Sequence, residues 1–211
     1  MIPFNTITDF HAFSHDELLH HAQACQKCPL SCERTQVVFH SGPPSSDFML
    51  IGEGPGQQED KEGVPFVGRS GQLLTKILES VGIDRNTIYI ANTVKCRPPN
   101  NRTPEPQEMA ACQDYLIRQI QLVQPKVIGL LGSAAVKAVL GSTHSISTIR
   151  GKWVTASVDY MADDLYIMPM FHPSYLLRHS SKEKGAPKWL TWQDMKEIKA
   201  ALSFYDTMSK P

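Results

Sequence analysis

The sequence lacks long hydrophobic runs and a recognisable secretion signal. Its longest apolar run lies around Val127 to Leu131, far short of the roughly 20 consecutive apolar residues that span a bilayer. The first residues have neither the basic start nor the apolar stretch and small-residue cleavage site of a signal peptide. We therefore expect a cytoplasmic protein without a membrane segment.

An excess of charge of one sign is also absent. Lys and Arg together number 21, as do Asp and Glu, so the bulk charge predicts no general attraction to a polyanion. Two segments are locally basic, residues 95–102 and residues 178–188. Each alone is typical of a solvated loop, so they favour a nucleic-acid partner only in combination with the motifs beside them.

Cysteines are few and odd in number. A disulfide framework is disfavoured in a reducing compartment, so we interpret four of them as ligands: Cys25, Cys28, Cys96 and Cys112. Four thiolates suit an iron–sulfur cluster or structural zinc, and the spacing alone does not separate these two, while unrelated buried thiols are a third alternative. The fifth, Cys32, is expected to be a packed or free thiol.

Short apolar segments alternate with helical patterns along the chain. The expected strands are residues 48–51, 88–91, 126–131 and 165–168. The expected helices run from a capping box at Ser14 to about residue 24, over 73–81, from a cap at Thr103 and Pro104 to about 123, over 133–140 and over 189–203. This alternation predicts an α/β fold, with parallel strands covered by helices on both faces.

Polar motifs follow three of the expected strands, where ligands bind in open parallel sheets. GEGPGQQED follows the first strand at 52–60, and its glycine spacing fits neither a dinucleotide fingerprint nor a P-loop. Glu53, in that turn, is a catalytic candidate because backbone amides there approach a ligand closely. His172 follows the fourth strand in a turn fixed by Pro173 and Ser174, although a structural histidine is the common alternative.

Taken together, four motifs resemble those of the family 4 uracil-DNA glycosylases. They are GEGPGQQED at 52–60, VPFVGRSGQLL at 64–74, NTVKCRPPNNRTP at 92–104 and HPSYLLR at 172–178. The resemblance spans most of the chain. It implies a three-layer αβα sandwich with a central four-stranded parallel sheet, forming a single domain over residues 1–211. It also implies a [4Fe–4S] cluster on Cys25, Cys28, Cys96 and Cys112 in preference to zinc.

The resemblance assigns base-recognition roles to three residues, because a glycosylase must flip its target out of the helix. Phe66 would stack on the flipped uracil. Asn92 would pair with uracil O4 and N3–H, which cytosine would not satisfy. His172 would donate to uracil O2 as negative charge accumulates there. Ordinary roles as a core aromatic, a strand-capping amide and a structural histidine remain the alternatives.

The remaining roles concern the sugar, the pocket wall and the DNA backbone. Glu53 would lie near the sugar, Gly54 would help to form a loop of amide donors, and Glu59 would face uracil C5 and exclude the methyl group of thymine. A wedge of Leu176 and Leu177 would fill the space left by the base, with Arg178 on phosphates. A core position for one leucine and a solvated helix-start position for Glu59 stay open.

These roles predict a monomeric, monofunctional glycosylase that acts on uracil in single- or double-stranded DNA and leaves an abasic site. Gln57, Gln58 and the Met170-Phe171 pair depart from the family pattern, which leaves activity on hypoxanthine or xanthine open. Two other hypotheses remain: a non-catalytic iron–sulfur DNA-binding module, and a zinc-stabilised nucleotide-binding domain.

Overall fold

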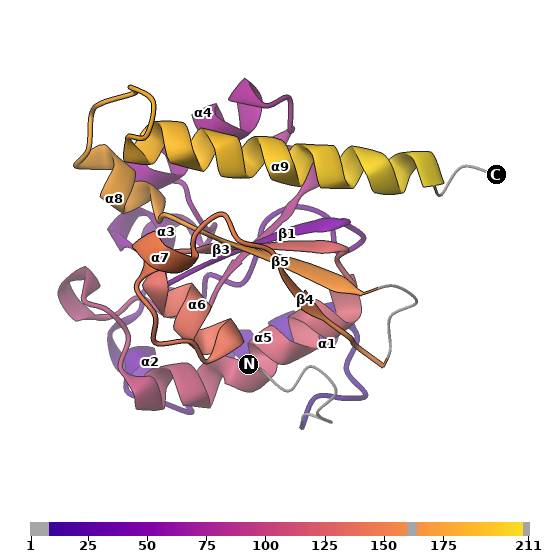
Figure 1. Ribbon diagram of the computed structural model, residues 1–211. Coiled ribbons are helices and arrows are strands. Elements are labelled where there is room, and N and C mark those ends of the chain that lie inside the picture. The colour runs from indigo at the N-terminus through magenta and orange to yellow at the C-terminus, as the bar shows by residue number, and fades with distance from the viewer. Residues whose placement is uncertain (1–8, 160–163, 209–211) are drawn as a thin grey trace.

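A mostly parallel sheet forms the centre of the computed structural model, which describes residues 9–159 and 164–208 (Figure 1). Within these residues the sheet has five strands in the order β2-β1-β3-β5-β4. The strands are β1 (Phe48–Gly52), β2 (Tyr89–Asn92), β3 (Val127–Leu131), β4 (Val154–Ala156) and β5 (Leu165–Met170). The first three and β5 pair in parallel, as predicted, whereas β4 pairs antiparallel with β5 at one edge. The fifth strand was not predicted, because three residues are too few for a periodic signal.

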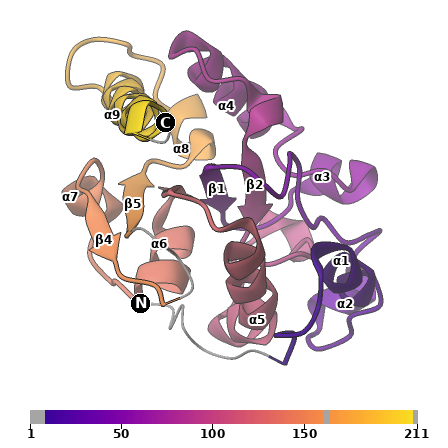
Figure 2. The ribbon, with the colours of Figure 1, turned by 90° about the vertical axis from the view of Figure 1, so that its right-hand side faces the viewer.

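Helices cover both faces of this sheet (Figure 2). One face carries α4 (Arg69–Ser80) and α9 (Pro187–Met208), and the other carries α5 (Pro106–Val123) and α6 (Ser133–Leu140). The described shorter elements are α1 (His15–Gln23), α2 (Leu30–Glu33), α3 (Gln57–Glu62), η1 (Arg85–Thr87), η2 (Pro99–Asn101), α7 (Ile146–Ile149) and α8 (Pro173–Leu177). The arrangement confirms the expected three-layer αβα architecture.

Strand β1 shows why both faces need cover. Phe48 and Leu50 pack in the cluster that includes α4 and α9, whereas Met49 and Ile51 pack in the cluster that includes α5 and α6. All four side chains are at most 2% exposed. A strand buried on both faces reads as a continuous apolar run because alternate side chains enter different cores.

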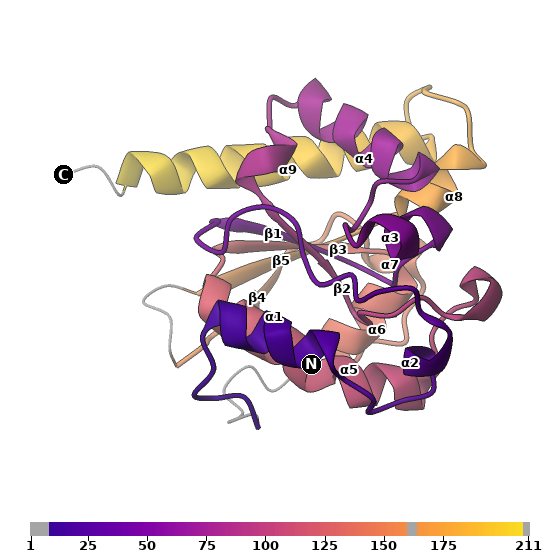
Figure 3. The ribbon, with the colours of Figure 1, turned by 180° about the vertical axis from the view of Figure 1, so that it is seen from behind.

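A third apolar cluster joins the N-terminal segment to the sheet layer. Helix α1 lies beside α5, with α2 near its end (Figure 3). Leu18 of α1 and Leu30 of α2 share this cluster with Tyr115 of α5, and Cys96 and Cys112 belong to it as well. The N-terminal segment is thereby brought against the two distant cysteines.

Helix boundaries agree with the sequence where a cap was read correctly. The capping box at Ser14 and Glu17 is present, and Gly141, in the left-handed conformation at φ +64°, ends α6. The predicted start of α5 was wrong: the helix begins at Pro106, after Glu105, whose backbone N–H donates to the carboxylate of Glu108 at 2.7 Å. No helix in the described ranges is long and apolar enough to cross a membrane.

Candidate active site

The carboxyl ends of three strands meet at one cavity. Gly52 at the end of β1 pairs in register with Asn92 at the end of β2, and His172 follows β5. Because the sheet order places β1 between β2 and β3, the chain leaves β1 at a topological switch point, where open α/β sheets bind ligands. The cavity has a volume of about 750 Å³, and six predicted site residues line it: Glu53, Gly54, Glu59, Phe66, Asn92 and His172.

The side chain of Asn92 is buried with one polar atom unpaired. It is 2% exposed, and its Oδ1 has no hydrogen-bond partner among the described residues. A Cβ atom at position 52 would lie 2.5 Å from this oxygen, so only glycine leaves room for it. An unsatisfied buried acceptor costs about 1–3 kcal/mol, which a ligand N–H in the cavity would recover.

The ring of Phe66 borders the same space. Its Cζ atom would lie 2.5 Å from a Cβ at Gly52, and its centroid is 5.8 Å from that of the His172 ring. Phe66 is also one of the few non-glycine residues with positive φ, at +56°. Bulky side chains rarely adopt this region, so the surrounding structure must hold the backbone there.

His172 is held as a neutral imidazole with a defined tautomer. The backbone N–H of Ser174 donates to Nδ1 at 3.1 Å, and the Ser174 hydroxyl lies 2.8 Å from the same nitrogen. Because Nδ1 accepts, the ring proton belongs on Nε2. Burial, assisted by the positive charge of Arg178, lowers the pKa of His172 to about 4. The ring is therefore a neutral hydrogen-bond donor at neutral pH.

The two glutamates of the first motif differ in their surroundings. Burial raises the pKa of Glu53, and a hydrogen bond from the Thr103 side chain opposes this shift. Thr103, expected to cap a helix, instead contacts this carboxylate. Glu59 is already occupied by backbone donors: Gly56 at 3.1 Å, Val67 at 3.1 Å and Gly68 at 2.8 Å. Its carboxylate connects the start of α3 to the loop after Phe66.

The predicted DNA wedge needs a correction at one residue. Leu176 has 0% exposure and lies in the interior, so it cannot contact DNA in this conformation. Leu177 is 38% exposed, and Arg178 beside it is exposed too. The leucines occupy adjacent positions on α8, and a helix directs adjacent side chains about 100° apart. Only Leu177 remains available as a wedge.

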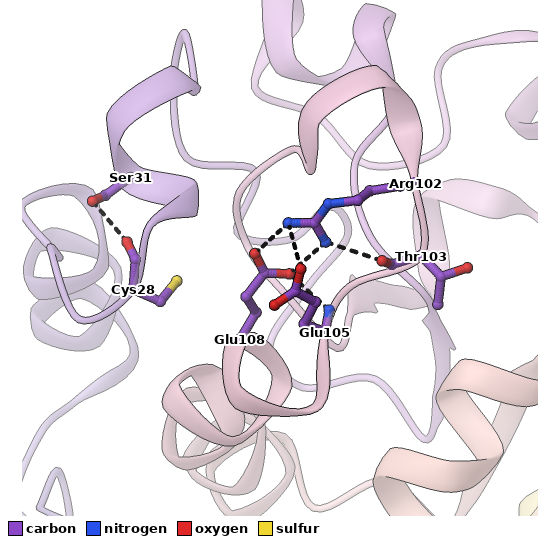
Figure 4. Close-up of polar contacts among 6 residues, drawn as sticks. All are labelled: Cys28, Ser31, Arg102, Thr103, Glu105 and Glu108. Atoms are coloured by element: carbon purple, nitrogen blue, oxygen red, sulfur yellow. Dashed lines mark hydrogen bonds and ion pairs between the residues drawn. The ribbon is translucent and has the colours of Figure 1, made fainter.

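The expectation of a solvated loop over the basic segment 95–102 is wrong at one of its three cations. Lys95 is 2% exposed. The guanidinium of Arg102 donates to both oxygens of Glu108, at 2.8 and 2.6 Å, and lies 3.5 Å from the Glu105 carboxylate (Figure 4). Hydrogen bonding from Arg102 lowers the pKa of Glu108. Lys95 therefore serves the interior, whereas Arg102 holds the start of α5 and also lines the first cavity.

The four cysteines interpreted as ligands line a second, small cavity, and the exposed Cys32 does not. Burial raises the pKa of Cys28 and Cys96, and that of Cys112 to about 12. Among residues 9–159 and 164–208, no three His, Cys, Asp or Glu side chains are grouped as metal ligands.

The residues around this second cavity suit an anionic group. Arg34 donates from Nη1 to the sulfur of Cys96 at 3.1 Å. The ammonium of Lys95 interacts electrostatically with Cys96 and Cys112, and both cations line the cavity. Two positive charges beside four thiols favour the deprotonated sulfurs that a metal or cluster requires.

Comparisons with known proteins identify the family of this chain. The model of the uracil DNA glycosylase superfamily matches residues 39–196. The type-4 uracil-DNA glycosylase of Thermotoga maritima is 48% identical over 160 residues, 75% of this chain and 81% of that protein. The enzyme of the same name from Sulfurisphaera tokodaii is 39% identical over 181 residues, which are 83% of this chain and 79% of that protein. The enzyme of the same name from Archaeoglobus fulgidus is 37% identical over 166 residues, which are 77% of this chain and 82% of that protein. The chain therefore belongs to the uracil-DNA glycosylase superfamily and, within it, to the type-4 enzymes.

Proposed function

We propose that this protein is a uracil-DNA glycosylase of base excision repair, which hydrolyses the N-glycosidic bond of uracil and leaves an abasic site. The observation that carries the proposal is the unpaired, buried Oδ1 of Asn92 beside the ring of Phe66 in one cavity. Uracil offers the N3–H donor that this oxygen lacks, whereas N3 of neutral cytosine carries no proton. Discrimination then follows from an unmet hydrogen bond.

The bond breaks with negative charge on the base and positive charge on the sugar. The Nε2–H of His172 donates to uracil O2 and stabilises the anionic base without transferring a proton, because the imidazole is neutral. Backbone amides of the loop that contains Gly54 add further donors. The carboxylate of Glu53 lies near the sugar, where it stabilises the cation and orients water. Glu59 acts on the pocket through the loop amides that it binds.

The cavity supports a monofunctional reaction. No lysine is among its lining residues within the described part of the chain, and an amine nucleophile is what a bifunctional glycosylase would use to form a Schiff base. The product is then an intact strand with an abasic site. Trapping of a covalent adduct by borohydride would contradict this assignment.

We propose that Cys25, Cys28, Cys96 and Cys112 hold a [4Fe–4S] cluster. When bound, the cluster connects the N-terminal segment, the chain beyond β2 and α5 through thiolate bonds. Arg34 and Lys95 offset the negative charge of the thiolates. Iron analysis and broad visible absorption of the purified protein test this proposal, and stoichiometric zinc in a colourless protein would overturn it.

The DNA-binding surface is proposed to lie around the end of α8. Leu177 enters the space vacated by the base, while Arg178 and the basic residues as far as 188 contact phosphates. The chain acts as a monomer and as one domain over residues 1–211, on single- or double-stranded substrate. The proposal predicts that the affinity for DNA falls clearly with rising salt concentration, although the net charge of the protein is zero.

Cleavage of an oligonucleotide with one uracil, followed by alkali, tests the function directly. The variants Asn92→Ala and His172→Ala are expected to lower the single-turnover rate by about 10²–10³, the loss typical of one transition-state donor. Asn86→Ala and His144→Ala, at exposed positions, serve as controls and should cut normally. A wild type that carries its metal centre but leaves the DNA uncut would favour a non-catalytic DNA-binding module.

A further inference from the structure

Arg85 lies outside the lining of the cavity but contacts the loop that carries Phe66. From η1, its Nη2 donates to the carbonyl oxygen of Pro65 at 2.6 Å, and its Nη1 donates to Thr75 Oγ1 at 3.0 Å. The side chain is half-buried. An arginine in this position fixes the backbone one residue before the aromatic ring and connects it to α4.

Glu59 holds the same loop from the other side of Phe66. Its Oε1 accepts from the backbone N–H groups of Val67 and Gly68, at 3.1 and 2.8 Å. The opposite charges of Glu59 and Arg85 also attract each other. Phe66 is thus flanked by a cation bound to the preceding carbonyl group and an anion bound to the two following amides.

The start of α4 packs against Phe66 as a third constraint on its backbone. A Cβ atom at Gly71 would lie 1.8 Å from the carbonyl oxygen of Phe66, so the helix runs directly against this peptide unit. A phenylalanine at φ +56° is strained, and such strain persists only where neighbouring contacts over-determine the backbone. Arg85, Glu59 and Gly71 are the contacts that do so.

We propose that Arg85 is a positioning residue for base stacking. Together with Glu59 it holds Phe66 in the left-handed conformation that places the ring beside Gly52 and Asn92, so that the base meets a preformed stacking surface. This inference rests on the proposed function, in which Phe66 stacks on uracil. Preorganisation of this kind increases affinity because the loop need not be ordered when the base enters.

A double-mutant cycle separates this role from a general effect on folding. The variants are Arg85→Met, Phe66→Ala and the combination, and the measured quantity is the inhibition constant of free uracil. Arg85→Met alone is expected to weaken uracil binding by roughly fivefold to a hundredfold, the loss expected when a base no longer stacks on an aromatic ring. In the Phe66→Ala background the same change should have less than about a twofold effect, because coupled residues are not additive.

Arg118→Met is the matched control, since Arg118 donates to the carbonyl oxygen of Phe13 at 3.1 and 2.7 Å on the opposite face of the molecule. It should lower the melting temperature without changing the inhibition constant. Arg85→Lys keeps the charge and one set of donors, so it should restore part of the uracil affinity. If Arg85→Met fails to fold, Arg85→Gln replaces it in the cycle, with the same expected direction.

Amide hydrogen exchange at Val67 and Gly68 reports on the loop without activity, and Arg85→Met should accelerate it. Equal effects of Arg85→Met with and without Phe66, or unchanged exchange, would overturn the proposal. Unchanged uracil binding in Phe66→Ala would also overturn it, while cleavage by the wild type would leave the proposed function intact. Conversely, an inactive wild type would refute the function, and the role of Arg85 would then be tested by amide exchange and by direct titration of uracil in a calorimeter, neither of which needs turnover.

Discussion

At the scale of single residues, the pocket depends on groups whose protonation is set by burial. His172 has a pKa of about 4, and its Nδ1 accepts the Ser174 N–H. A neutral donor suits an anionic leaving base because it stabilises charge without being consumed. The cleavage rate that depends on His172 should therefore be independent of pH around neutrality.

The acid limb of the pH–rate profile provides a prediction. Protonation of His172 puts a hydrogen on Nδ1 and breaks the bond from Ser174, so the single-turnover rate should fall as pH drops through about 4. A limb centred near 6.5, the ordinary pKa of histidine, would contradict this. Circular dichroism at each pH controls for unfolding.

Protonation of Glu53 should make a second contribution to the acid limb of the pH–rate profile. Burial raises its pKa above 4.5, so in wild type the carboxylate is lost at a higher pH than in an exposed glutamate. Glu53→Gln should lower the rate at pH 7 by about 10²-fold, and it should remove this component from the limb. An unchanged profile would remove Glu53 from the reaction.

The sequence placed Glu53, Asn92 and His172 correctly in one cavity, because parallel strands bring their carboxyl ends to one edge. Arg85 carried no motif, and its contact with Pro65 depends on the packing of η1 against α4. A core position for one of the two leucines was anticipated, but the sequence did not show that it would be Leu176, since a five-residue helix contains too few positions to define an apolar face.

At the scale of elements, α4 constrains the loop before it. Gly71→Ala should destabilise the protein by more than about 4 kcal/mol or displace Phe66, because the new methyl group would clash with backbone. Gly82→Ala, where nothing lies within 4 Å but φ is +71°, should cost only about 1 kcal/mol. Urea denaturation of both variants measures the contrast, and similar losses would contradict it.

The segment after β2 connects the two cavities. Lys95 donates from Nζ to the Asn92 carbonyl at 2.7 Å and to Gln119 Oε1 at 2.5 Å, while its backbone N–H bonds to the sulfur of Cys112. Lys95→Met leaves both buried acceptors unpaired, at about 1–3 kcal/mol each. The variant should lose stability, the proposed cluster and uracil affinity together. Lys76→Met, at an exposed position on α4, is the control. If Lys95→Met loses stability but keeps its cluster and its uracil affinity, Lys95 does not connect the two cavities.

The long elements were predictable, and the short ones were not. Strands β1 and β3 and helices α5 and α6 contain enough apolar positions to show their period. Helices α2, α3, α7 and α8, with four to six residues, depend on tertiary contacts for their existence. Three of them border a cavity: α3 and α8 contribute residues to the lining of the first cavity, and α2 to that of the second.

At the scale of the whole molecule, two partly buried histidines, His40 and His172, make stability depend on pH. His40 stacks on Tyr89 with ring centroids 5.0 Å apart. Burial lowers its pKa to about 4; the charges of His15 and Lys95 lower it too, and Asp16 opposes them.

His40 and His172 both have folded-state pKa values of about 4, below the unfolded value of 6.5. Between these limits the unfolded chain binds more protons, so the free energy of unfolding should fall as pH drops from about 6.5 to 4. His40→Gln should reduce this slope in urea titrations across that range. A slope unchanged by the substitution would show that other groups carry it.

Helix α8 has a further consequence through its length. It begins just after His172 and ends just before Arg178, and five residues at about 1.5 Å each span roughly 7.5 Å. Under the proposed roles, this length separates His172, which binds the flipped base, from Arg178, which contacts the phosphates, by about two base-pair steps. One inserted residue would rotate Leu177 by about 100° around the axis. The distance along the DNA between the excised base and the phosphates that the protein binds is then set by about one and a half turns of helix.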